Sequence, residues 1–185
     1  AKTLGLFLQE KFFINDKVSV LAGLRYDHVD FEIQDKFLSN GDQTEELEFN
    51  EMTYSIGVSY NATSFLNYYF NYSTAFETPT FTEFANPSSN GTLGGFANVS
   101  AQKSDGYELG MRINTSKFLK TSFAYYHLDV EDEVTTVSNV DGRAFFNNAD
   151  TRRSGIELDF QVMLVENLDL SASFTHSNLN FTKFF

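Results

Sequence analysis

The chain has 185 residues, with 21 Phe, 9 Tyr, no Trp and a formal net charge of −12, which suits one domain or part of a larger one. The absence of Cys excludes a disulfide scaffold and a thiolate zinc site, and the negative charge disfavours nucleic acid as a partner. The apolar content is too high for a disordered chain, yet no run of about 18 apolar residues is present to form a helical membrane span.

Apolar and polar residues alternate along most of the chain, as they do in a strand with one apolar face. The alternation is clear in six segments and less regular in the first and sixth of the eight. In chain order the segments are 4–13, 18–26, 52–60, 66–72, 107–113, 118–130, 156–164 and 168–174. We therefore expect eight strands.

The connections between these segments alternate between short and long. Short turns are expected at 15–17, 61–64, 114–117 and 166–167, and long polar segments near 34–51, 77–103 and 131–153. In an up-and-down antiparallel sheet, this order places every short turn at one end and every long connection at the other. Bacterial outer-membrane barrels have this asymmetry.

Aromatic residues mark both ends of the expected strands. Phe12, Phe13, Tyr60, Phe65 and Phe118 lie beside the short turns, and Tyr26, Tyr72, Phe76 and Tyr125 lie at the far strand ends. Two such bands are typical of a barrel that crosses two membrane interfaces, and charged residues on the polar sides suit a wet lumen. The expected fold class is therefore an all-β, antiparallel, up-and-down transmembrane β-barrel.

Four segments resemble strands of TonB-dependent outer-membrane receptors, and they occur in the family's order. They are the G-x-R-Y-D segment at 23–27, the segment 72–84 with its Phe-Glu-Thr-Pro-Thr element, the Y-E-L-G strand at 103–110 and the N-x-x-x-x-R-x-x-G-x-E strand at 147–158. Gln102 and Lys103 stand where an acidic residue is common in the family. The resemblance covers nearly the whole chain.

The resemblance implies a barrel of about 22 strands filled by a plug domain. Such receptors import ferric siderophores, cobalamin, pyrroloquinoline quinone or other scarce compounds, with energy relayed through TonB. Residues 1–185 would be about eight strands from the middle-to-late part of that barrel, with no plug domain, so TonB would be contacted only through the absent plug. The implied location is the bacterial outer membrane, with lipid and a small-molecule ligand as partners, no cofactor and no enzymatic activity.

The long connections contain the candidate ligand-binding residues. Aromatic rings and guanidinium groups suit an anionic, ring-bearing ligand such as a metal chelate, most simply a ferric siderophore. The candidates are Phe81, Phe84, Phe96, Arg143, Phe145 and Phe146. The alternative is that these side chains pack the loops onto one another.

No residues form a clear catalytic or metal site. His28, His127 and His176 are too scattered for a ligand cluster, and each lies near the loop-side end of a strand. The acidic segments at 129–133 and 45–48 lack the Gly and the spacing of a calcium-binding EF-hand loop, so both are expected to be solvated loops.

Two other function classes stay open. One is a complete eight-stranded outer-membrane barrel with a structural or adhesion role, and the other is a soluble β-sandwich that acts as a binding module. The first strand starts within a few residues of Ala1, and 177–185 contains no turn chemistry. Both features favour a slice of a larger barrel over a complete small one.

Overall fold

The computed structural model describes most of the chain, with gaps at the turns and in the long connections. The described residues are 1–34, 36, 38–40, 42, 44–80, 83, 99–115, 118–140, 143–165 and 168–184, without the side chains of 40, 137–140 and 143–146. Within these residues, no helix has the length and the apolar character needed to cross a membrane.

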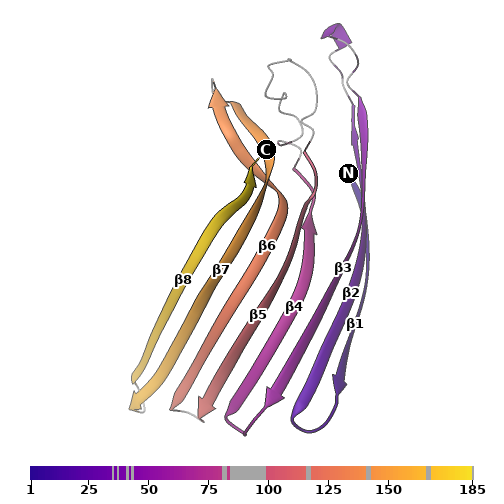
Figure 1. Cartoon of the computed structure of the whole chain (residues 1–185). Coiled ribbons are helices and arrows are strands. Elements are labelled where there is room, and N and C mark those ends of the chain that lie inside the picture. Colours follow the sequence, from indigo (N-terminus) through magenta and orange to yellow (C-terminus); the bar gives the residue numbers. More distant parts are fainter. Residues whose placement is uncertain are drawn as a thin grey trace.

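Eight antiparallel strands form a single sheet, and each strand pairs with its neighbours in sequence. The elements are β1 (Lys2–Phe13), β2 (Val18–Ile33), η1 (Leu38–Asn40), β3 (Glu45–Asn61), β4 (Leu66–Glu77), β5 (Gln102–Thr115), β6 (Leu119–Val140), β7 (Arg143–Val165) and β8 (Leu168–Phe184). The order β1 to β8 is an up-and-down meander (Figure 1). The all-β antiparallel fold class and the eight strands are confirmed.

The sheet is open at both sides. Every pairing in the described part of the chain joins strands that are consecutive in sequence, and none joins β1 to β8. A closed eight-stranded barrel would need that pairing, and a β-sandwich would need a second sheet. Neither alternative matches the described strands.

The short turns gather at one end of the sheet and the long connections at the other (Figure 1). In the turn between β1 and β2, Asn15 Oδ1 accepts hydrogen bonds from the backbone N–H groups of Lys17 and Val18, each at 2.9 Å. Thr63 Oγ1 accepts from the N–H of Leu66 at 3.1 Å in the turn between β3 and β4. These side chains satisfy backbone donors that the strand ladders leave free.

The strands run further toward the long-connection end than the alternation predicts. β3 begins at Glu45, so 45–48 is strand and not a solvated loop. The expected loop over 131–153 is also wrong, because β6 and β7 fill nearly all of it as a continuous hairpin. Polar cross-strand pairs such as Thr135 and Asn147 support this extension without an apolar face, which is why no alternation marks it.

A glycine of the Y-E-L-G strand has a clear steric role. Gly110 of β5 pairs with Tyr69 of β4, and the Tyr69 ring lies across it. A Cβ atom at position 110 would lie 2.6 Å from Tyr69 Cε1, which is too close for any two such atoms. Tyr69 is only 7% exposed as a result. An aromatic ring covering a strand glycine in this way fixes the register of the two strands.

Gly110→Ala should lower the free energy of unfolding by about 1–3 kcal/mol, because the Tyr69 ring has to leave its position. Urea unfolding of the whole receptor in detergent measures the change. Gly57→Ala is the matched control, since a Cβ there approaches only the flexible end of Asn71, at 2.8 Å.

The double variant Tyr69→Ala with Gly110→Ala isolates the clash, because the truncated side chain leaves room for the new methyl group. Gly110→Ala should destabilise this background less than the native one. An equal loss in both backgrounds would contradict the steric role.

Candidate functional site

Apolar side chains line up across the whole sheet on one side. Alternate residues of a strand point to opposite faces, and the register of the ladders brings the apolar ones together. One row across five strands is Val58, Phe70, Leu109, Tyr125 and Ile156. We call this side the apolar face.

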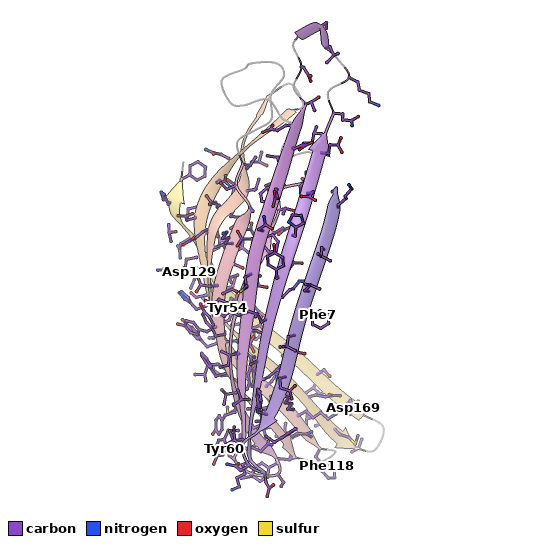
Figure 2. The ribbon with its side chains drawn as sticks, turned by 90° about the vertical axis from the view of Figure 1, so that its right-hand side faces the viewer. Phe7, Tyr54, Tyr60, Phe118, Asp129 and Asp169 are labelled. Atoms are coloured by element: carbon purple, nitrogen blue, oxygen red, sulfur yellow. The ribbon has the colours of Figure 1, made fainter. Side chains whose placement is uncertain are left out.

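The opposite side, the polar face, carries the adjacent row Gly57, Asn71, Glu108, Tyr126 and Gly155. Side chains on the two faces project in opposite directions, as Tyr54 and Phe7 do in Figure 2.

In the middle of the sheet, the apolar face is the more exposed of the two. Met52 and Leu109 are 59% and 54% exposed, whereas Glu51 and Glu108 on the polar face are half-buried. A water-soluble sheet buries its apolar face and exposes its polar one. The reverse pattern indicates that an apolar solvent covers the apolar face, as lipid covers the outside of a membrane barrel.

Tyr26, Tyr54 and Tyr72 mark the level at which the apolar face ends, and we call it the tyrosine level. The Tyr26 hydroxyl donates to Asn50 Oδ1 at 2.7 Å, and the Tyr72 hydroxyl lies 3.4 Å from Asp105 Oδ2. The Tyr54 ring lies 6.0 Å from the Tyr72 ring. Rings with one apolar and one hydrogen-bonded end are favoured at a membrane interface.

The two aromatic bands are present, but the far band is displaced from its expected place. Tyr26, Tyr72 and Tyr125 lie inside β2, β4 and β6 and not at their ends, because these strands continue past the tyrosine level. Tyr60 and Phe118 lie beside the short turns (Figure 2). The apolar face of β3 runs from Met52 to Tyr60, which is nine residues and agrees with the ~9–11 of a membrane-spanning strand.

Beyond the tyrosine level, the apolar face gives way to charged side chains. His28 Nδ1 lies 2.8 Å from Asn50 Oδ1, and its Nε2 lies 3.2 Å from Asp30. The contact with Asn50, together with the carboxylate of Asp30, raises the pKa of His28. On β6 and β7, Arg152 donates to Asp129 at 2.6 Å and lowers the pKa of that carboxyl. These charges place this part of the sheet in water.

The acidic segment 129–133 lies in β6 and is not the solvated loop predicted from the sequence. Arg152 holds Asp129, while Glu133 accepts hydrogen bonds from Thr151 and Arg153. Asp129 pairs directly with Arg152, and a bulge shifts the register between Val130 and Glu133. In the described part of the chain, no group of three His, Cys, Asp or Glu residues is placed to hold a metal ion.

The polar face also changes character at the tyrosine level, where it becomes apolar. We name the residues concerned the vestibule wall: Val29, Phe31, Ile33, Leu47, Phe49, Leu128, Val130, Leu179 and Phe181. The rings of Phe31 and Phe49 meet edge to face at 6.1 Å, and Val29 and Val130 are 8% and 2% exposed. An apolar surface therefore lines the inner side of the sheet near the long connections.

A short segment before β5 crosses the vestibule wall. Val99 is 7% exposed and packs against Phe49 of β3 and Val134 of β6. The Ser100 N–H donates to Asn148 Oδ1 at 3.0 Å, and Asn148 Nδ2 donates to the Ser100 carbonyl at 3.4 Å. The segment thus joins β3 to the hairpin of β6 and β7.

The predicted ligand-binding residues can be placed only in part. Phe81, Phe84 and Phe96 lie outside the described residues. The backbone of 143–146 begins β7 and pairs with the end of β6, at the same end of the sheet as the vestibule wall, and the side chains of Arg143, Phe145 and Phe146 lie outside the described part. The roles of both sets of residues in ligand binding therefore stay predictions.

Sequence reasoning missed the vestibule wall, although the sequence contains its signal. On β2 the apolar residues move from even to odd positions between Tyr26 and Val29, and on β8 they do so between Phe174 and Leu179. A shift by one residue exchanges the two faces. The shift can be interpreted only when the level of the membrane boundary is known.

A family model described as "TonB dependent receptor-like, beta-barrel" matches residues 1–184. An uncharacterized TonB-dependent receptor from Haemophilus influenzae is 26% identical over 180 residues, which cover 96% of this chain and 49% of the relative. This chain therefore spans about half the length of that curated relative.

Among solved structures, the copper transporter OprC aligns with a TM-score of 0.85 at 19% identity, over 98% of this chain and 29% of OprC. The ferric yersiniabactin uptake receptor FyuA from Yersinia pestis aligns with a TM-score of 0.74 at 16% identity, over 97% of this chain and 27% of FyuA. At these identities, both comparisons support the fold alone.

Leu109→Arg tests the assignment of the apolar face to lipid. It should lower the free energy of unfolding of the receptor in lipid vesicles by about 2–4 kcal/mol, the known range for a cation near the bilayer midplane. Asn71→Arg, one row away on the polar face, should change it by about 0.5 kcal/mol or less. Equal effects of the two substitutions would contradict the assignment.

Proposed function

Because the chain belongs to the TonB-dependent receptor-like β-barrel family, we propose that it forms part of the barrel wall of an importer for a ferric siderophore or a similar metal chelate. TonB-dependent receptors are bacterial outer-membrane transport proteins and not enzymes. Membership therefore implies a membrane and a small-molecule ligand, and the identity of that ligand is the proposal.

One observation carries the transport role, which is the reversed burial of the two faces. A wall that is apolar and exposed on one side, and polar and half-buried on the other in the middle of the sheet, suits a barrel that separates lipid from a wet interior. Glu108, Arg112 and Glu157 lie on the polar face, where water or another polar domain can solvate them.

The vestibule wall supports a chelate with apolar or aromatic parts as the cargo. Phe49 and Phe181 lie on the inner side near the long connections, where an incoming ligand first meets the receptor. Of the predicted ligand residues, Arg143, Phe145 and Phe146 have their backbone at the same end of the sheet, whereas Phe81, Phe84 and Phe96 lie outside the described residues.

We further propose that residues 1–185 are one stretch of a larger barrel domain. The plug domain and the contact with TonB would then come from other parts of the whole protein. The partial coverage of the relatives, 49% of one sequence and 29% of one structure, supports this arrangement.

The experiment is equilibrium binding of an iron-labelled ferric catecholate chelate to the whole receptor in detergent. The triple variant Arg143→Ala, Phe145→Ala, Phe146→Ala should weaken binding about tenfold or more, or ~1.4 kcal/mol. Phe174→Ala removes one ring from the lipid-facing side and should leave binding unchanged.

Two results would contradict the proposal. Binding that survives the triple variant would remove these residues from the site. Tight binding of free copper together with no binding of any ferric chelate would replace the proposed cargo.

A further inference from the structure

A groove of about 430 Å³ crosses the polar face of β5 to β8 near the short turns, at the opposite end from the vestibule wall. Its lining combines two cations, one carboxylate and neutral hydrogen-bonding groups. The polar side chains that matter here are Arg112, Asn114, Lys120, Ser122, Asp159 and Ser173.

The register brings the two cations together. Arg112 of β5 pairs with Ser122 of β6, and Lys120 of β6 pairs with Asn114 of β5. Arg112 and Lys120 are therefore diagonal neighbours on adjacent strands, about 7–8 Å apart at their backbones. Both side chains are exposed on the same face, and long cationic side chains at this spacing can contact one bound group.

Arg112 is held in place by a stack of supporting residues. Its guanidinium lies 4.1 Å from the centre of the Tyr69 ring, and that ring lies on Gly110. A guanidinium carries five N–H donors, so the contact with Tyr69 leaves donors for a planar or tetrahedral oxyanion. Tyr69 and Gly110 thus help to hold the guanidinium in place before any ligand binds.

Neither cation has an acidic partner among the residues that the structure describes. The ion pairs found there involve Arg25, Lys103, Arg152, Arg153 and two histidines. Asp159, the carboxylate of the groove, accepts from Ser173 Oγ at 2.8 Å and from Ser122 Oγ at 3.2 Å. Among the described residues, no ion pair joins Asp159 to Arg112 or Lys120, so neither cation is neutralised by direct contact with a carboxylate.

We propose that Arg112 and Lys120 form an oxyanion-binding site on the inner wall, which holds a carboxylate of the cargo as it passes toward the short-turn end. The inference rests on the proposed transport function and adds a chemical property to the cargo, an exposed anionic oxygen group. Phosphate presents the same chemistry to the two cations, so the test includes it as a separate probe.

The test measures binding of citrate, and separately of inorganic phosphate, to the whole receptor in detergent by titration calorimetry. Citrate should bind the native protein, and Arg112→Gln and Lys120→Gln should each weaken its binding about tenfold or more. Arg112→Lys keeps the charge but lacks the planar guanidinium group. Its affinity for citrate should therefore lie between the affinities of the native protein and of Arg112→Gln. Lys11→Gln is the matched control, because Lys11 is also a polar-face cation and lies over the Phe13 ring, outside the groove.

Three outcomes would overturn the site: no binding of citrate to the native protein, equal binding in all variants, or a loss in Lys11→Gln as large as in Lys120→Gln. If phosphate binds more tightly than citrate, the proposal that the site holds a carboxylate of the cargo is wrong. Lys120 is exposed and forms no ion pair or side-chain hydrogen bond with the described residues, so Lys120→Gln tests the site even where Arg112→Gln perturbs folding.

The probes are free anions, so the result is independent of chelate binding. If the receptor binds the ferric chelate but not citrate, the oxyanion site is rejected and the proposed function is retained. If it binds citrate through Arg112 and Lys120 but binds no chelate, the proposed cargo is rejected and the oxyanion site is retained.

Discussion

Every backbone N–H and C=O group that lies in lipid has to find a hydrogen-bond partner within the protein. Here the seven ladders provide these partners for β2 to β7 and for the inner edges of β1 and β8. Because a strand alternates its side chains with a period of two, the register that pairs the backbone also decides which residues meet lipid. The alignment of Val58, Phe70 and Leu109 and the placing of Tyr69 over Gly110 are both consequences of that one constraint.

The sequence predicts the part of the fold that lies in the membrane, because there the alternation is local. In 52–60, lipid on one side and polar surroundings on the other select residues of opposite character at each step. The extension of β6 and β7 leaves no such trace, since each of its cross-strand pairs contains a polar residue and partners such as Glu133 and Arg153 are distant in sequence. Asn148 and Ser100 are 48 residues apart, so their contact depends on the assembled sheet.

The exchange of faces at the tyrosine level connects the fold to its use. Below this level the outer side is apolar and the inner side polar, and above it His28 and Asp30 face outward while Val29 and Phe31 face inward. One strand can therefore be a membrane wall along part of its length and present an apolar inner surface along the rest. The predicted ligand residues at 143–146 start from this same end, although the sequence alone gave no reason to group them with β2 and β3.

The exchange of faces is tested most directly by nitroxide labels placed singly on the whole receptor in lipid vesicles. The informative positions are Leu109 within the membrane, Asp30 beyond the tyrosine level and Val29 beside it. Leu109 should be accessible to oxygen dissolved in lipid, Asp30 to a water-soluble nickel complex, and Val29 should be shielded from both. A label at Leu109 in contact with water, or labels at Asp30 and Leu109 with the same accessibility, would contradict the account.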